Sequence, residues 1–399
     1  MPVKLPEKGF SKSKVIADIN MAVADDQQYD TGHILGSMCT TPHTFAIKIA
    51  SMYPEKNLGD PGLFPGTSRL EAETIQMLGD MLGDEHVVGN IVGGGSEANI
   101  IAMRVAKKFK ENLEKPEVLA PETVHASFYK AADFMGFKIK ALKLDKDFEF
   151  DLAEFDSAIN KNTIGVVGIA GTTSLGLVDP IEQMGKIIES KNNDIFFHVD
   201  AAFGGFVLPF LRDLGYKLPK FDFLVPQVMS MTCDPHKMGL NLIPSGSFIL
   251  REHFYKDVLG FDIPYLAGGA FKHFNVMGTR PGNVVLACWG LMRHLGREGY
   301  RAVVKECWDN TLYLRERLKE LEKYIGVARE PMINVLGMTS NTNVPMSEID
   351  KALRNKGWYL GFFRNMNPPI ERIVVMPHVK SPAIDVFIED LGKIVRELH

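Results

Sequence analysis

Short apolar runs alternate with helical patterns through the middle of the chain, and this alternation limits the folds that it can adopt. Residues 164–170, 195–200, 228–233 and 247–250 have the length and composition of buried strands. Residues 181–189, between the first two runs, repeat apolar side chains at helical spacing. Strands that alternate with helices form a largely parallel sheet whose two faces are covered. The pattern therefore predicts an α/β fold built on a mainly parallel sheet.

Polar side chains gather at the carboxyl ends of these predicted strands. Each of five residues lies at or just beyond the end of an apolar run: His125, Thr172, Thr173, Asp200 and Lys237. In open α/β sheets, ligands bind outside the carboxyl ends of the strands. Because four separate segments point to the same edge of the sheet, we predict one ligand-binding crevice there.

A lysine and an aspartate in this group suit pyridoxal phosphate chemistry. Lys237 ends the sequence Asp-Pro-His-Lys, and Asp200 lies in the upstream sequence His-Val-Asp-Ala-Ala. A lysine amine must lose its proton before it can form an imine, and desolvation beside another cation can bring its pKa far below about 10.4. An aspartate can pair with the pyridine nitrogen of the cofactor and keep the ring an electron sink. Taken alone, either fragment has a simpler interpretation, as a turn-capping aspartate or a surface lysine.

A glycine-rich turn supplies the third part of such a site. The sequence Gly-Gly-Gly-Ser-Glu-Ala-Asn at 93–99 precedes an apolar helical pattern at 100–105. Glycines let the backbone approach an anion closely, Ser96 can cap the helix, and the free N–H groups of the helix start can bind phosphate. The turn is neither GxGxxG nor followed by Gly-Lys-Ser/Thr, so the dinucleotide and P-loop interpretations fail. Beside Lys237 and Asp200, we interpret it as a monophosphate site rather than an ordinary capped turn.

Charge and cysteine content argue against several other classes of protein. The formal net charge is -4 and the basic residues are scattered, which argues against a nucleic-acid or anionic-membrane partner. No apolar run approaches the roughly 20 residues of a bilayer span, and the first residues lack the apolar core of a signal peptide. The four cysteines form no CxxC pair, so neither a zinc site nor a disulfide framework is predicted. We expect a reduced, cytoplasmic protein.

Changes in the sequence pattern along the chain predict three segments. Residues 1–50 are expected to form an irregular arm with one short helix at 12–24, and residues 51–285 a large domain. Residues 286–399 are expected to form a smaller α+β domain. This last segment contains two helical patterns and one clear strand, at 286–294, 303–323 and 373–376.

Taken together, these motifs resemble the group II pyridoxal-phosphate-dependent amino-acid decarboxylases, and among them the archaeal L-tyrosine/L-aspartate decarboxylases. The resemblance covers nearly the whole chain, from Glu-Lys-Gly at 7–9 to Arg-Ile-Val-Val-Met-Pro-His at 372–378. Pro-His-Lys is specific to this group, whereas Asp-Ala-Ala and Gly-Thr-Thr occur more widely. The resemblance implies fold type I (aspartate aminotransferase-like), with a large domain built on a mainly parallel sheet and a smaller C-terminal α+β domain. It also implies pyridoxal 5'-phosphate as the cofactor and a homodimer with active sites at the subunit interface.

The same resemblance implies which residues hold the cofactor. Lys237 would form the imine, Asp200 would bind the pyridine nitrogen, and Gly95 with Ser96 would hold the phosphate. The remaining contacts would come from His125 stacked on the ring, from Thr172 beside it and from Ala202. For His125, the alternative is a hydrogen-bonded histidine of the core.

Substrate and catalytic roles are implied in the same way. His236 would flank the imine, Arg372 would hold the substrate's α-carboxylate, and Asn57 lies in a stretch that resembles the pocket lining, parts of which come across the dimer interface. Tyr265, in an expected mobile loop at 262–269, could protonate the substrate carbon after carbon dioxide leaves. The alternatives are a surface salt bridge for Arg372 and an ordinary packing role for Tyr265. The sequences at 240–244 and 268–273 depart from the pattern of the family, and both departures concern the substrate pocket.

The implied reaction is decarboxylation of an L-amino acid with release of carbon dioxide. Tyrosine would give tyramine for methanofuran biosynthesis, aspartate would give β-alanine for coenzyme A biosynthesis, and glutamate is a third substrate to consider. Transamination and carbon–carbon cleavage use the same lysine, aspartate and phosphate site, so the residues alone leave them open. A cofactor-binding protein without catalysis is another alternative. A metal enzyme built on His198 and Asp200, which alternate on one strand face, lacks further ligands, and we expect no metal.

Overall fold

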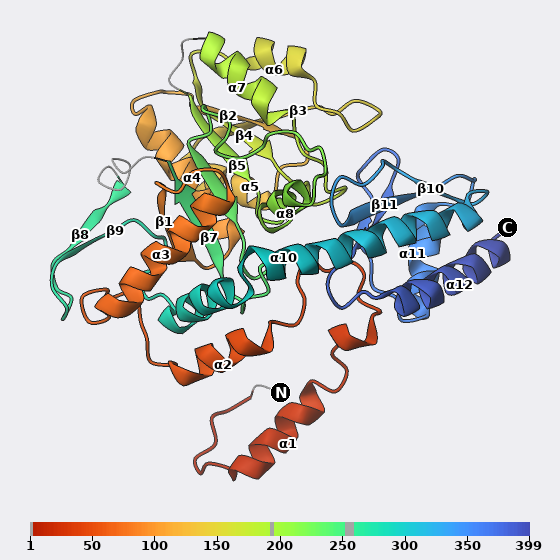
Figure 1. Cartoon of the computed structure of the whole chain (residues 1–399), viewed down its shortest axis with the longest axis horizontal. Coiled ribbons are helices and arrows are strands. Elements are labelled where there is room, and N and C mark those ends of the chain that lie inside the picture. Colours follow the sequence, from red (N-terminus) through yellow and green to blue (C-terminus); the bar gives the residue numbers. More distant parts are fainter. Residues whose placement is uncertain (1–2, 192–194, 252–258) are drawn as a thin grey trace.

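A seven-stranded sheet forms the centre of the structure, a computed structural model that describes residues 3–191, 195–251 and 259–399 (Figure 1). Its strands, in spatial order, are β1 (Val88–Val92), β7 (Gly246–Leu250), β6 (Ser230–Cys233), β5 (Phe196–Asp200), β4 (Thr163–Ile169), β2 (Glu117–Pro121) and β3 (Lys138–Leu142). The pairs from β6 through β3 are parallel, whereas β7 runs antiparallel to both of its neighbours. The predicted α/β fold with a mainly parallel sheet is confirmed.

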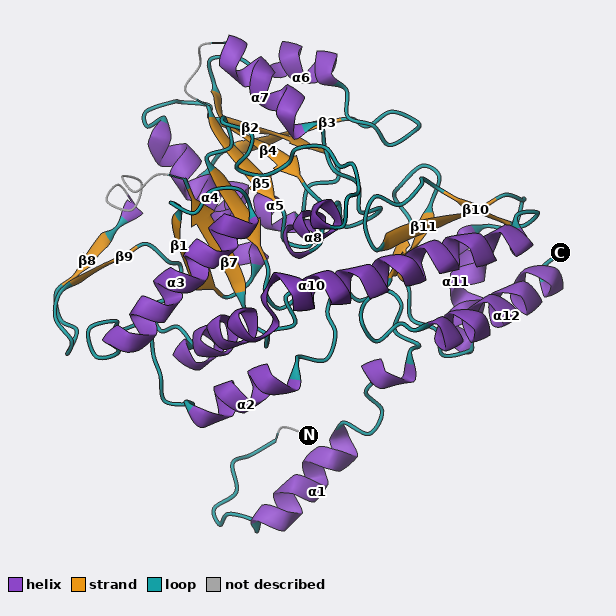
Figure 2. Cartoon of the chain, in the orientation of Figure 1, coloured by secondary structure: helices purple, strands orange, loops and turns teal. Residues whose placement is uncertain are grey.

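Helices cover both faces of this sheet (Figure 2). One face packs against α4 (Gly95–Phe109) and α5 (Ala126–Met135). The other face packs against α3 (Pro65–Met81), α6 (Leu152–Ala158), α7 (Ile181–Ser190), α8 (Leu208–Asp213) and the long α10 (Gly282–Leu318). Short 3-10 turns lie at Tyr29–Thr31, Gly204–Phe206 and Lys319–Leu321.

Strand alternation decides which side chains of β5 meet α4. Phe197 and Val199 belong to the core under α7, and Phe196 belongs to the core under α4 and α5. Side chains two residues apart lie on the same face of a strand. His198 and Asp200 therefore share the α4 face with Phe196, and the geometry of the site depends on this placement.

A second, smaller sheet lies in the C-terminal part of the chain. Its four antiparallel strands are β10 (Ile325–Val327), β11 (Val335–Ser340), β13 (Ile370–Val374) and β12 (Gly361–Phe363), in that order. The helices α11 (Met346–Asn355) and α12 (Ser381–Glu397) pack on it together with the end of α10. The helical patterns at 286–294 and 303–323 belong to α10, which is interrupted at Gly296, where φ is 57° and glycine carries no steric penalty.

The N-terminal residues contain two α-helices rather than the single one predicted. The expected helix is α1 (Lys12–Ala22), which buries no residue. The second, α2 (Thr44–Met52), packs Ala46 and Ala50 against α10. Its amino end is capped by the side chain of His43, an unusual capping residue, so the usual start signal was absent from the sequence. Among the described residues, no helix has the length and hydrophobicity needed to span a membrane.

Asp179 is a buried carboxyl group that stabilises the turn after β4 by hydrogen bonds. Its Oδ2 accepts the Ile169 N–H at 2.7 Å, and its own N–H donates to the Ile169 carbonyl at 2.9 Å. Desolvation raises the pKa of Asp179 from 3.8 to about 7, although the Ile169 hydrogen bond opposes the shift. Between these two pH values the folded chain holds a proton that the unfolded chain has lost. The contribution of this group to stability is therefore complete below about pH 4 and is lost as the pH rises through 7.

Replacement of Asp179 by Asn should remove this pH dependence, because the amide oxygen can still accept from Ile169 but does not titrate. We expect the free energy of unfolding of the wild type, relative to Asp179→Asn, to fall by up to about 4 kcal/mol between pH 4 and pH 8. Urea unfolding at a series of pH values measures this difference. Asp133→Asn, at an exposed position of α5, is the control. Parallel pH profiles for the wild type and Asp179→Asn would contradict the assignment.

Candidate active site

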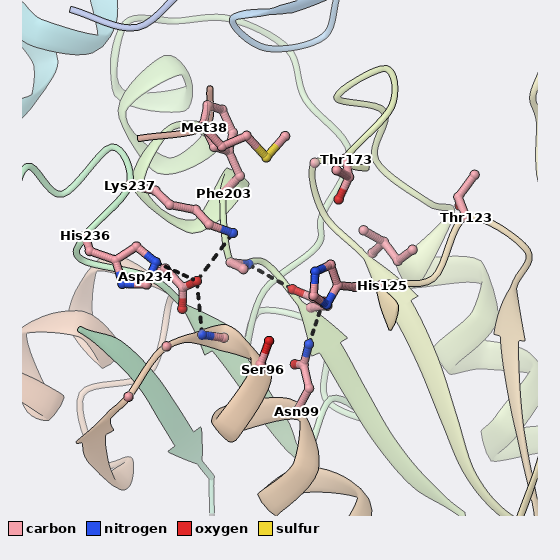
Figure 3. Close-up of a pocket in the computed structure, with 17 residues that line it drawn as sticks. Met38, Ser96, Asn99, Thr123, His125, Thr173, Phe203, Asp234, His236 and Lys237 are labelled. Carbon is pink, nitrogen blue, oxygen red and sulfur yellow. Dashed lines mark hydrogen bonds and ion pairs between the residues drawn. The ribbon is translucent and has the colours of Figure 1, made fainter. Parts of the chain in front are cut away.

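A cavity of about 250 Å³ lies at the carboxyl ends of the central strands (Figure 3). It is bordered by the start of α4, by the loops after β2, β4, β5 and β6, and by a segment of the N-terminal part that contributes Met38. Seven of the predicted site residues line it: Gly95, Ser96, His125, Asp200, Ala202, His236 and Lys237. The expected single crevice at this edge of the sheet is confirmed.

Lys237 points into the cavity beside a second aspartate, Asp234. The Nζ atom of Lys237 lies 3.3 Å from Oδ2 of Asp234. The same oxygen accepts the Gly95 N–H at 3.1 Å and lies 3.5 Å from Nε2 of His236. Asp234 is buried, and its Oδ1 has no hydrogen-bond partner within the described part of the chain. Asp234 thus joins Lys237 to the glycine-rich turn. Sequence reasoning quoted this residue in the Asp-Pro-His-Lys motif but did not assign it to the site.

Asp200 is a buried carboxyl group on the α4 side of the cavity. Its Oδ2 accepts a hydrogen bond from Nδ2 of Asn99 at 2.8 Å, and its Oδ1 accepts the Ala202 N–H at 3.1 Å. Among the described residues, no lysine, arginine or histidine forms an ion pair with it. A buried carboxylate is costly unless a cation balances its charge. A protonated pyridine nitrogen is the kind of group that would complete this arrangement.

The start of α4 is shaped to receive an anion. Gly94 precedes the helix with φ at +129°, a conformation that glycine adopts readily, and as the cap residue it has no side chain to bond the first N–H groups, of which that of Gly95 donates to Asp234. A Cβ atom on Gly246 would lie 2.3 Å from the Gly94 carbonyl carbon, so β7 can pass this turn only as glycine. The expectation that Ser96 caps the helix is wrong, because the cap position belongs to Gly94. Ser96 is the second helical residue and lines the cavity.

The two histidines of the site are oriented by backbone N–H groups. The Nδ1 atom of His125 accepts the Ser127 N–H at 3.2 Å and thereby caps α5, while its exposed ring lines the cavity. This exposure rules out the alternative of a core histidine. The Nδ1 atom of His236 accepts the Ser245 N–H at 3.0 Å, and burial lowers the pKa of His236. His236 is therefore neutral near pH 7, with its hydrogen on the Nε2 atom that faces Asp234.

Two other predicted residues lie behind the cavity wall. Oγ1 of Thr172 accepts the Leu177 N–H at 3.0 Å, and the neighbouring Thr173 lines the cavity in its place. Arg372, on β13, is 8% exposed, so it is not the surface ion pair considered as its alternative. It donates through Nη1 to the Thr173 carbonyl at 2.7 Å and through Nη2 to the Gly36 carbonyl. Burial lowers the pKa of Arg372 to about 10. Arg372 therefore joins two segments of the wall without lining the cavity itself.

Tyr265 and Asn57 do not lie at the cavity that contains Lys237. Tyr265 follows β8 (Phe261–Ile263), which pairs with β9 (Phe271–His273) in a separate hairpin at the edge of the molecule (Figure 1). Its side chain is 80% exposed. Oδ1 of Asn57 accepts the Gly59 N–H at 2.7 Å, and Gly59 and Tyr265 line a different cavity. Within one chain, neither residue can take the role that the resemblance implied.

Sequence reasoning also missed residues that complete the cavity. These are Asn99, which binds Asp200, and Phe203 in the wall, whereas Thr173, which also lines the cavity, was among the residues predicted at this crevice. Asn99 closes the glycine-rich motif, so a signal for it existed: it lies one helical turn after Gly95, on the side of α4 that faces β5. Phe203 had no comparable signal, because its position in the wall depends on how segments distant in the chain pack.

Comparison with known proteins supports the interpretation of this site. Residues 33–336 match the model of the pyridoxal-dependent decarboxylase conserved domain. The L-aspartate decarboxylase of Thermococcus kodakarensis is 42% identical over 393 residues, which cover 98% of this chain and 100% of that protein. A probable L-tyrosine/L-aspartate decarboxylase of Methanothermobacter thermautotrophicus is 42% identical over 363 residues, 91% of this chain and 97% of that protein. Among solved structures, the sphingosine-1-phosphate lyase of Burkholderia pseudomallei has a TM-score of 0.89 at 26% identity, covering 99% of this chain and 93% of that one.

These similarities confirm the resemblance inferred from the motifs, the fold type I architecture and pyridoxal phosphate as the cofactor. The residues present fit that cofactor, because the cavity offers a lysine, a buried carboxylate without a cationic partner in the described chain, and an uncapped helix start. The enzyme catalyses the pyridoxal-phosphate-dependent decarboxylation of an amino acid. The chain belongs to the pyridoxal-dependent decarboxylase family.

Proposed function

We propose that the enzyme converts L-aspartate to β-alanine and carbon dioxide. The observation that carries this substrate is the 42% identity, along the full length of both proteins, to an enzyme named L-aspartate decarboxylase. L-Tyrosine is the second candidate, because Met38 and Phe203 give the cavity apolar walls and a relative with equal identity is named for both substrates. Aromatic side chains pack well against such walls. Glutamate remains a third possibility to be tested.

In the proposed mechanism, Lys237 holds the cofactor covalently through Nζ. The bound cofactor supplies an electron sink for the bond that breaks at the substrate's α-carbon. Lys237 must lose a proton and regain it in each cycle, and Asp234 lies near enough to exchange it, since its Oδ2 is 3.3 Å from Nζ. His236, whose Nε2 lies 3.5 Å from the same oxygen, can donate a hydrogen bond to Asp234. Asp200 balances positive charge at the ring nitrogen, and the uncapped start of α4 holds the phosphate.

Arg372 is proposed to orient the substrate's α-carboxylate. Its guanidinium is buried behind Thr173 and bonds two backbone carbonyl oxygens. Its Nε has no partner within the described residues. If the substrate's α-carboxylate replaced one of these two backbone carbonyl oxygens as the acceptor, Arg372 would form a stronger, charge-assisted hydrogen bond. The same exchange would move Thr173 or the segment that carries Met38, so substrate binding would reshape the cavity wall.

We further propose that two chains associate, and that Tyr265 and Asn57 act in the partner's cavity. The support is that both lie away from Lys237 of their own chain, on a separate hairpin and beside a second cavity. The helix α1 leaves Ile16 and Ile19 exposed on one face, and uncovered apolar side chains of this kind are usually buried in an assembly. In this proposal, residues 1–50 form an arm, residues 51–285 the large domain and residues 286–399 the small domain. The four cysteines are unpaired, as a reducing compartment such as the cytoplasm would require.

Loss of Lys237 should abolish covalent cofactor binding. We expect Lys237→Ala to lower turnover by at least about 1,000-fold, because no other amine in the cavity can replace it. The purified variant should also lack the visible absorbance of lysine-bound cofactor. Lys217→Ala, at an exposed position after α8, is the matched control and should keep both properties. An active Lys237→Ala enzyme would refute the mechanism.

A competition assay would identify the substrate. Purified enzyme with added cofactor receives aspartate, tyrosine, glutamate, phenylalanine and DOPA together, and mass spectrometry reads the products. We expect β-alanine to dominate. Tyramine as the main product would favour the second candidate. Keto acids, or no change in any of the five amino acids, would contradict decarboxylation of these substrates.

Mixed dimers would test the proposal for Tyr265. Lys237→Ala and Tyr265→Phe homodimers should each be nearly inactive. If Tyr265 acts in the partner's cavity, co-expression of the two variants places an intact Lys237 and an intact Tyr265 together in one of the two sites of each mixed dimer. We expect these dimers to recover about half of the wild-type activity. Mixed dimers that stay inactive while the homodimers remain folded would show that Tyr265 does not act across the interface.

A further inference from the structure

We propose that Asn99 is a positioning residue that holds both Asp200 and His125 in the arrangement that the cofactor requires. This inference rests on the proposed roles of Asp200 at the ring nitrogen and of His125 at the ring face. It adds a residue whose own contribution is to orient these two groups and to donate a hydrogen bond to Asp200. Figure 3 shows Asn99 rising from α4 toward the part of the cavity that His125 faces.

Asn99 uses every hydrogen-bonding position of its side chain. Its Nδ2 donates to Oδ2 of Asp200 at 2.8 Å and to Oγ of Ser127 at 3.0 Å. Its Oδ1 accepts from the hydroxyl of Thr232 at 2.7 Å and from Nε2 of His198 at 3.1 Å. The residue is 1% exposed. A carboxamide has two donor hydrogens and two acceptor lone pairs, and all four are engaged here.

The neighbours of Asn99 permit only one orientation of its carboxamide. Burial lowers the pKa of His198 to about 4, so its ring is neutral near pH 7. Its Nε2 faces the Asn99 oxygen, which can only accept, so Nε2 carries the hydrogen and Nδ1 accepts from the Ser230 hydroxyl at 2.8 Å. A flipped carboxamide would set its oxygen against the carboxylate of Asp200 and its hydrogens against that N–H group. His198 therefore acts as an orienting donor for Asn99, and the structure places it in this role rather than in a metal site.

The second hydrogen of the Asn99 amide leads to His125. Ser127, which accepts that hydrogen, lies 3.0 Å from Nδ1 of His125 through its own Oγ. One carboxamide nitrogen thus contacts Asp200 directly and His125 through a single hydroxyl. Because Asn99 lies one turn after Gly95 on α4, the same rigid helix carries the proposed phosphate site and this connection. The spacing between the three cofactor contacts is set by one element.

The electrostatic effect of Asn99 follows from the groups that face it. On β5 these are Asp200 and the neutral His198, and on α5 it is His125, reached through Ser127. From β6 it meets the hydroxyl of Thr232, which does not titrate near neutral pH. On α4 itself, Glu97 is engaged elsewhere, with the N–H groups of Gly93, Val276 and Met277. The Asn99 N–H is therefore a donor to a carboxylate without a cationic partner in the described chain.

The variant Asn99→Asp tests this role because it keeps the shape and exchanges the donor for an acceptor. Two carboxylates would then face each other, and their repulsion raises the pH at which the pair takes up a shared proton. We expect the dissociation constant of pyridoxal phosphate from the reconstituted apoenzyme to rise by about 10- to 100-fold at pH 8, relative to wild type. The loss should shrink toward pH 6, because a proton shared between residues 99 and 200 restores a donor. In Asn99→Ala the loss should not depend on pH.

Addition of cofactor to the apoenzyme, followed by absorbance or fluorescence, gives these dissociation constants. The wild type is measured at each pH in parallel, so that the effect of pH on the protonation of the cofactor itself can be subtracted. Asn355→Asp, at the exposed end of α11, is the matched control and should bind as the wild type does. Wild-type affinity in Asn99→Asp would overturn the proposal. So would an equal, pH-independent loss in Asn99→Asp and Asn99→Ala, because Asn99 would then support packing alone.

A second variant keeps the test decisive if Asn99→Asp does not fold. Thr232→Val removes one donor to Oδ1 of Asn99 and leaves Asp200 and His125 untouched. We expect its dissociation constant for the cofactor to rise by about 3- to 10-fold, and unchanged affinity would count against the role of Asn99. These titrations contain no substrate, so they test cofactor binding separately from catalysis. If the wild type bound the cofactor normally but decarboxylated no amino acid, the proposed function would be refuted and this inference would stand.

Discussion

The site is organised around the burial of Asp200, a carboxylate that meets no cationic side chain within the described residues. Its charge is held by two N–H groups, one from the Asn99 side chain on α4 and one from the Ala202 backbone. Such an arrangement is costly unless a cation is supplied from outside the chain. The protonated ring of pyridoxal phosphate can supply it. The packing of α4 on β5 therefore stabilises the fold and also places the Asn99 donor beside Asp200.

The parallel sheet explains how distant residues meet at this carboxylate. Asp200 ends β5, Asp234 and Lys237 follow β6, and His125 follows β2, so the carboxyl ends of three strands bring them to one edge. Asp234 then ties Lys237 to the turn before α4, and Arg372 ties the segment near Met38 to the loop after β4. The Asp234 contacts lie within the region of the large sheet, whereas the Arg372 contacts join that region to the small sheet.

Much of this could be predicted from local pattern. The runs at 164–170 and 195–200 correspond to β4 and β5 to within one residue at each end, because strands buried on both faces are continuously apolar. Lys237, Asp200, Gly95 and His125 were placed at the cavity because their motifs lie where strands end. The predictions failed where a side chain had two possible local uses. Ser96 lies two residues past the cap position of α4, and the hydroxyl of Thr172 is used by its own turn.

The sequence by itself determined the alternation of strands and helices, the lysine and aspartate pair, and hence the cofactor chemistry, because each of these depends on neighbours within a few residues. Only the tertiary structure decided which side chains share the cavity. It brought Asn99 to Asp200 and Asp234 to Lys237, and it left Tyr265 at a different cavity and Asn57 outside the cavity of Lys237. These distances depend on how helices and loops far apart in the chain pack together, and side-chain contacts of that kind leave no period or motif in a single sequence.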